Sequence, residues 1–203
     1  FFVSAVLKVS NWDNALFLAE HEYPVDWLYP ATAAWLGATT ELCGSVLLAL
    51  GLATRGAAGP LLVLSLVIQL EYHALDAHLF WAALFLWYLV RGAGPLSLDA
   101  MLARGLAAAP LPVVPALLRL GGAVARRGGP LLQLALRLWL AASLAAAVAM
   151  LTPGAAVQAW LPLESAANFP FPVAVAGALL LAAGVAARVT ALAMMTALLA
   201  APM

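Results

Sequence analysis

The chain has 203 residues, and its nine basic and nine acidic side chains give a formal net charge of zero. Hydrophobic residues make up 66% of the sequence and charged residues only 9%, whereas a soluble domain carries about 25% charged residues. So few charges cannot cover a water-facing surface, which excludes a soluble enzyme domain. The Leu/Ala-rich composition excludes a disordered chain, and the balanced charge argues against a nucleic-acid-binding protein. The single cysteine, Cys43, excludes an internal disulfide, so an integral membrane protein remains.

Long, mainly apolar segments follow one another along the chain. A bilayer core about 30 Å thick needs about 20 apolar residues in a spanning helix. The segments that we predict to span, or to span with their flanks, are Ala31–Ala53, Ala57–Tyr72, Leu79–Val90, Leu131–Leu151, Val173–Ala187 and the shorter Val189–Met203. They show no alternation of apolar and polar residues, so the predicted fold class is all-α, a polytopic membrane helix bundle.

The two ends of the sequence are shorter than a membrane crossing. Phe1–Lys8 is apolar but covers only a few helical turns, and Val189–Met203 stops before completing a span. We expect the first helix to be truncated at its start and the chain to be a fragment of a longer protein.

Residues 11–30 are polar, acidic and rich in aromatic side chains. Within them, Trp12, Leu16, Ala19 and Tyr23 fall on one helical face, and Asn11 precedes them in the position of an N-cap. This pattern predicts a short helix that lies in the membrane interface.

The segment between the third and fourth long spans has two parts. Residues 92–99 read GAGPLSLD, which predicts a turn followed by a short helix capped by Ser97. Residues 108–130 are rich in Pro, Gly and Arg, and we predict that they form a cytoplasmic connector rather than a span, because inserting the arginines would be costly.

The predicted spans place basic and acidic side chains on opposite sides of the membrane. Seven arginines outside the predicted spans fall on one side, namely Arg55, Arg91, Arg104, Arg119, Arg126, Arg127 and Arg188. Arg137, in the first turns of the fourth span, lies on the same side. The acidic residues Asp13, Glu20, Glu22, Asp26, Asp76 and Glu164 fall on the other. Because loop Lys and Arg mark the cytoplasmic side, residues 11–30 are expected to face the periplasm.

A weak internal repeat divides the chain. Leu47–Arg55 aligns with Leu180–Arg188, and Gly44 then aligns with Gly177. We therefore predict a four-helix unit at 1–107, the connector at 108–130 and a partial, degenerate second unit at 131–203. The second unit has Ala174 at the position of Glu41 and no lysine in the place of Lys8.

The candidate site consists of polar residues inside or beside the predicted spans. Glu41 lies about ten residues into its helix, or about 15 Å deep, where an ionisable residue usually pairs or lines a cavity. Lys8 is the nearest basic candidate, and Glu71 and His73 lie at the outer end of the third span. Two interpretations stay open: a structural ion pair, or a site that binds a ligand or handles protons. No metal is predicted, because the nearby His and acidic residues match no ligand motif.

The first unit resembles the DoxX family of small bacterial membrane proteins. The residues that carry the resemblance, in chain order up to about residue 105, are FVSAVLK at 2–8, Trp12-Asp13, EYP at 22–24, Glu41 with Gly44, LGLATR at 50–55 and GAGPLSLD at 92–99. The chain departs from the family at Ala93, where the family prefers proline.

The resemblance implies a four-helix bundle in the bacterial inner membrane that anchors or serves a quinone-linked redox system. It implies no catalytic residues, and if the chain belongs to an enzyme it forms the membrane part of an oxidoreductase. Quinone is the ligand that the resemblance suggests, and flavin or NADH would enter only through a further domain. The expected partners are the lipid bilayer and an oxidoreductase domain or subunit. A small-molecule transporter or channel and a purely structural subunit are the alternatives.

Overall fold

The computed structural model describes residues 1–72, 76–106, 113–148, 160–161 and 171–184. Within these ranges every regular element is a helix, which confirms the all-α fold class. The predicted span Val189–Met203, together with Arg188 and His73, lies outside the described residues.

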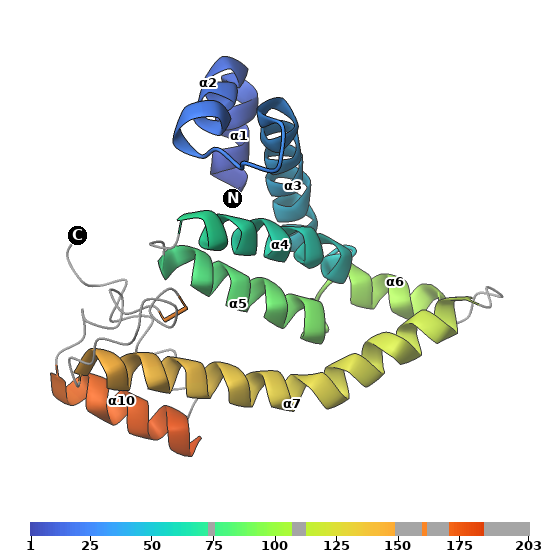
Figure 1. The fold of residues 1–203 in the computed structure, drawn as a ribbon. Helices are drawn as coiled ribbons and strands as arrows, with labels where there is room; N and C mark the ends of the chain where they lie inside the picture. The colour runs from blue at the N-terminus through green and yellow to red at the C-terminus, as the bar shows by residue number, and fades with distance from the viewer. Residues whose placement is uncertain (73–75, 107–112, 149–159, 162–170, 185–203) are drawn as a thin grey trace.

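The N-terminal helices form one group in Figure 1. It comprises α1 (Phe2–Ser10), α2 (Trp12–Phe17), the π-helix η1 (Leu18–Glu22) and α3 (Pro30–Leu50). The Asn11 side chain accepts a hydrogen bond of 3.1 Å from the backbone N–H of Asn14, so the predicted N-cap is confirmed. Alanine side chains lie where these helices pack against one another: Ala5, Ala15 and Ala34 are all buried.

Helices α4 (Thr54–Tyr72) and α5 (Asp76–Arg91) lie side by side below α3. Helix α3 ends at Leu50, and the positive φ of 62° at the following residue, Gly51, suits glycine. Gly44 allows α3 to approach α4 closely, because a Cβ atom there would lie 2.7 Å from the Leu61 side chain. The four helices α1, α3, α4 and α5 are those predicted for the first unit.

Helix α6 (Leu98–Leu106) is attached to the turn between α3 and α4. The Asp99 carboxylate accepts hydrogen bonds from the backbone N–H groups of Ala53, at 2.7 Å, and Thr54, at 2.9 Å. Ser97 Oγ accepts from the N–H of Ala100 at 3.2 Å, which confirms the predicted cap of α6. Asp99 therefore joins the end of the first unit to the start of α4.

Helix α7 (Val113–Val148) is continuous through Pro130, which differs from the predicted connector. The division of the chain into two units stays a prediction, but residues 113–130 form no separate linker. They are the first part of a helix that contains the fourth predicted span. Pro115 falls in the first helical turn, where its missing N–H breaks no hydrogen bond, and Leu, Ala and Arg favour a helix over much of the following segment.

Helix α10 (Phe171–Ala183) lies against the C-terminal half of α7. Arg137 of α7 donates from Nε to the carbonyl oxygen of Leu181 at 3.0 Å, and a basic side chain stabilises a helix C-terminus in this way. Gly184 follows with a positive φ of 73°. Gly51 and Gly184, which the predicted repeat aligns, therefore both follow a helix in the left-handed conformation.

By length and composition, two of the described helices could cross a bilayer, Pro30–Leu50 and the stretch Leu118–Ala146 of α7. His78–Arg91 is a shorter apolar helix. Helix α4 forms where a span was predicted but is not one of the two. The apolar stretch of α7 begins at Leu118, within the segment that we predicted to stay outside the membrane.

Candidate binding site

An ion pair joins α1 to the middle of α3. Lys8 Nζ donates to Glu41 Oε1 at 2.7 Å, so the predicted pairing of these two residues is present. The Glu41 side chain is 5% exposed and the Lys8 side chain 28%. The carboxylate is therefore held inside the protein, while the lysine reaches it from a more open position.

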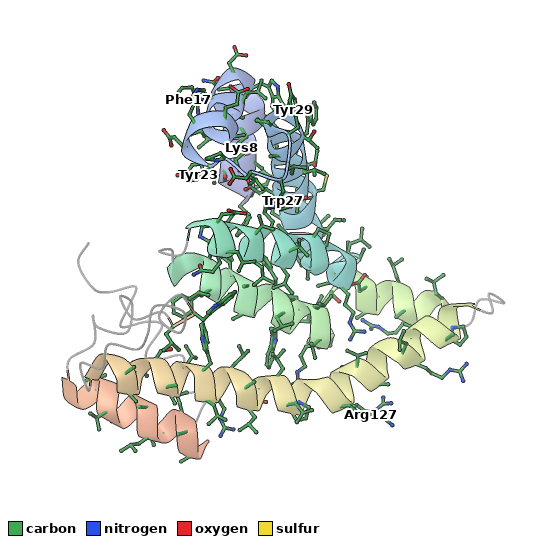
Figure 2. The ribbon with its side chains drawn as sticks, in the orientation of Figure 1. Lys8, Phe17, Tyr23, Trp27, Tyr29 and Arg127 are labelled. Atoms are coloured by element: carbon green, nitrogen blue, oxygen red, sulfur yellow. The ribbon has the colours of Figure 1, made fainter. Side chains whose placement is uncertain are left out.

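The pair lines a pocket of about 450 Å³ formed by six helical segments and the loop after η1. Figure 2 labels Lys8 and Tyr23, which both line it, among the N-terminal helices. Small side chains leave the space, and the lining residues are Ser4, Lys8, Ala15, Leu18, Ala19, Tyr23, Val25, Ala33, Ala34, Gly37, Glu41, Leu64, Val67, Ile68 and His78. The wall is mostly apolar with a few polar groups, which is typical of a small-molecule site.

Two buried polar atoms of the pocket-lining residues have no hydrogen-bond partner among the described residues. They are Glu41 Oε2 and His78 Nδ1. The Glu41 carboxylate also lies within electrostatic range of the His78 ring. Because a buried polar group without a partner is costly, these two atoms mark where a polar ligand group would bind.

The structure places Glu71 outside this pocket. The Glu71 side chain is exposed, accepts a hydrogen bond of 3.2 Å from Trp27 Nε1, and does not line the pocket. His73 lies outside the described residues.

His78 lines the pocket with Glu41, whereas Glu71 and His73 were the residues predicted to do so. The sequence contains a pattern that points to His78, because His78, Ala82 and Phe85 recur at helical spacing. In the structure both Ala82 and Phe85 are buried. His78 itself is half-buried; it lies on the same face of α5 as these two residues and lines the pocket.

The outer helix covers one side of this pocket. Ala15 of α2 and Leu18 and Ala19 of η1 line it. A helix forms over the segment where one was predicted, but its second part is a π-helix, which the sequence pattern does not reveal. Single π-turns are found frequently at functional sites, which agrees with the position of η1 against the ion pair.

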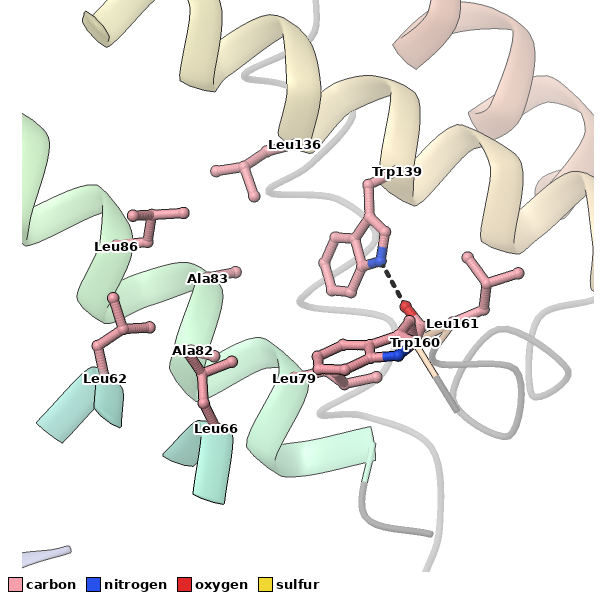
Figure 3. Close-up of a pocket in the computed structure, with 10 residues that line it drawn as sticks. All are labelled: Leu62, Leu66, Leu79, Ala82, Ala83, Leu86, Leu136, Trp139, Trp160 and Leu161. Carbon is pink, nitrogen blue, oxygen red and sulfur yellow. Dashed lines mark hydrogen bonds between the residues drawn. The ribbon is translucent and has the colours of Figure 1, made fainter. Parts of the chain in front are cut away.

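A second pocket, of about 620 Å³, lies between α4, α5 and α7 (Figure 3). Leucine and alanine side chains form most of its wall, and Trp139 Nε1 donates to the carbonyl oxygen of Trp160 at 2.8 Å. With that N–H already engaged, the pocket has little to offer a polar ligand. In the described part of the chain, no three His, Cys, Asp or Glu side chains gather to hold a metal ion.

The matched region of the chain contains the ion pair. Residues 1–74 match the DoxX family model. The resemblance inferred from the sequence is confirmed over these residues, which include Lys8 and Glu41 but not His78. No curated protein and no solved structure matches the chain. The family match and the two apolar helices together support a membrane protein.

Proposed function

We propose that this chain is a multi-pass module of a bacterial inner membrane that binds a quinone-type headgroup in the Lys8–Glu41 pocket and so serves a membrane redox system. The observation that carries the proposal is the buried carboxylate, whose Oε1 bonds Lys8 while its Oε2 has no partner among the described residues. The redox context is what the resemblance to the DoxX family implies.

The chemistry of the pocket fits such a headgroup. A quinone-type ring is a flat apolar body with an oxygen atom at each of two opposite ends. The apolar side chains of Leu64, Val67 and Ile68 offer a surface for the ring. Glu41 Oε2 can accept a hydrogen bond from a ring hydroxyl, and His78 Nδ1 can donate to or accept from a ring oxygen. A volume of about 450 Å³ falls within the range of about 300–1,000 Å³ that is usual for small-molecule sites.

The proposed orientation places the pocket near the periplasmic side. Residues 11–30 would face the periplasm and the Arg-rich segments the cytoplasm, as the charge distribution favours. The bilayer and an oxidoreductase domain or subunit are the proposed partners. A flavin or NADH would be held by that domain, because nothing in the described pocket resembles a dinucleotide-binding loop.

Saturable binding of a quinone-type ring by the purified full-length protein tests the proposal. The protein is placed in lipid nanodiscs and titrated calorimetrically with duroquinone and with duroquinol, its tetramethylhydroquinone form, and the heat measured with empty nanodiscs is subtracted. We expect one saturable site for at least one of the two.

The double variant Lys8→Met/Glu41→Gln should weaken this binding at least about tenfold, as expected for the loss of one charge-assisted hydrogen bond. The matched control Glu20→Gln makes the same chemical change at an exposed residue outside the pocket and should leave the affinity unchanged. Absence of saturable binding to the wild-type protein would overturn the proposal. It would leave the Lys8–Glu41 pair as a structural contact between α1 and α3.

A further inference from the structure

We propose that the pocket selects a ligand that donates a hydrogen bond, and therefore binds the hydroquinone form of a quinone-type ring in preference to the oxidised form. This inference rests on the proposed function, and it concerns which redox form of the ligand the site stabilises. The juxtaposition that carries it is a buried, half-satisfied carboxylate at the wall of an apolar pocket.

Glu41 is the residue that discriminates between the two forms. Its Oε1 accepts from the Lys8 ammonium at 2.7 Å, a short distance typical of a charge-assisted hydrogen bond to an ionised carboxylate. The remaining oxygen, Oε2, can then only accept a hydrogen bond. The hydroxyl of a hydroquinone donates to it, whereas the carbonyl oxygen of a quinone would face it with no hydrogen between them.

Lys8 does not offset this preference. Its remaining N–H groups could donate to a quinone carbonyl, but the Lys8 side chain is 28% exposed and therefore less deeply buried than that of Glu41, which is 5% exposed. Exchanging one hydrogen-bond partner for another brings little net free energy, whereas satisfying a buried atom that has no partner removes its full desolvation penalty. The gain on binding is therefore greater at Glu41 Oε2 than at Lys8.

His78 serves either form of the ligand. Its Nδ1 donates or accepts according to the tautomer of the ring, so it can meet a hydroxyl or a carbonyl oxygen at the ligand. The selectivity consequently lies with Glu41, and His78 contributes affinity for both forms.

The consequence is a shift in the redox equilibrium of the bound ligand. A site that binds the reduced form tenfold more tightly raises the midpoint potential of a two-electron couple by about 30 mV. The pocket would thus retain the reduced ring and release the oxidised one more readily.

Three ligands with the same ring test the inference on the wild-type full-length protein in nanodiscs, under anaerobic conditions. They are duroquinol, duroquinone and the dimethyl ether of duroquinol, which keeps the apolar body but has no hydroxyl hydrogen. We expect duroquinol to bind at least about tenfold more tightly than either of the others. Equal affinities, or tighter binding of duroquinone, would overturn the selectivity while leaving the proposed function intact. A lack of saturable binding by all three would overturn both.

Variants locate the selectivity at the carboxylate. The double variant Lys8→Met/Glu41→Gln removes both charges together and leaves no charge stranded, and its preference for duroquinol over the dimethyl ether should fall below about threefold. Glu20→Gln should keep the wild-type preference. A double variant that still prefers duroquinol tenfold would contradict the assignment to Glu41. Circular dichroism and gel filtration check that the double variant is folded. If it is not folded, the affinities of the three ligands for the wild-type protein alone test the inference.

Discussion

Glu41 shows how one buried acidic residue can serve both packing and binding. Its Oε1 holds Lys8, which lies 33 positions earlier in the chain, and so joins α1 to α3. Its Oε2 is buried and has no hydrogen-bond partner among the described residues, in a side chain that lines the pocket. Removing the lysine would strand a buried carboxylate, whereas removing both charges would not.

The ion pair should therefore show strong coupling in a double-mutant cycle. Lys8→Met alone should lower the free energy of unfolding by about 3 kcal/mol, the lower end of the range for breaking a buried pair, because the lysine is partly exposed. The double variant Lys8→Met/Glu41→Gln should regain most of that loss. Thermal unfolding in detergent measures both, and additive effects of the two single changes would contradict the coupling.

Gly44 is the second residue whose size matters. A Cβ atom there would meet Leu61 at 2.7 Å, and Leu61 is fully buried. Gly44→Ala should therefore destabilise the protein by about 1–3 kcal/mol through overpacking, and Leu61→Ala in the same chain should relieve the overlap. Thermal unfolding of the single and double variants measures this. The control is Gly56→Ala, where an added Cβ meets nothing within 4 Å; a similar loss of stability there would point to a general effect of alanine instead.

At the scale of the elements, hydrogen bonds of Asp99 attach α6 to the start of α4. Asp99 accepts from the backbone N–H groups of Thr54, the first residue of that helix, and of Ala53 just before it. Its own N–H donates to the Gly51 carbonyl oxygen at 2.8 Å. An acidic side chain also interacts favourably with the positive end of the helix dipole. These hydrogen bonds connect residues about 45 positions apart in the sequence.

Asp99→Ala should therefore act like the loss of an N-cap. We expect a loss of about 1–2 kcal/mol and faster proteolysis within α6, since no residue of that helix is buried. Asp99→Asn keeps one acceptor oxygen and should have an intermediate effect. Thermal unfolding and limited proteolysis measure these changes. If Asp99→Ala unfolds like the wild type, the two hydrogen bonds contribute nothing to stability.

For the whole molecule, the distribution of charge predicts its orientation in the membrane. Between residues 77 and 163 the sequence contains several arginines and a single acidic residue, Asp99, and that carboxylate is already engaged with α4. The acidic segment at 11–30 lies at the other end of the predicted spans. A uniform excess of arginine on one side is the pattern of a cytoplasmic face.

Cysteine labelling checks this orientation. In a Cys43→Ser background, a membrane-impermeant maleimide added to intact cells should label Asp26→Cys and should not label Gly105→Cys. Both residues are exposed, and a side chain at Gly105 meets nothing within 4 Å, so neither change should disturb packing. After the membrane is permeabilised, both positions should react. Labelling of Gly105→Cys but not Asp26→Cys in intact cells would reverse the proposed orientation.

The sequence by itself determined the features that depend on composition or on neighbouring residues. A chain with 9% charged residues requires apolar helices, and the caps formed by Asn11 and Ser97 act within three residues of their own position. The Lys8–Glu41 contact could also be inferred, because a charge deep in an apolar helix requires a partner and few basic residues were available nearby.

The tertiary structure alone decided which polar residues line the same pocket and where a helix continues past a predicted end. His78, rather than Glu71, lines the pocket with Glu41, because the relative rotation of α4 and α5 is set by packing between helices and not by either sequence. Helix α7 continues through Pro130, where local rules favour an end. Its contacts with α5 and α10 supply packing free energy that local helix preferences do not include. Contacts between residues far apart in the chain leave no local pattern, so only the folded arrangement reveals them.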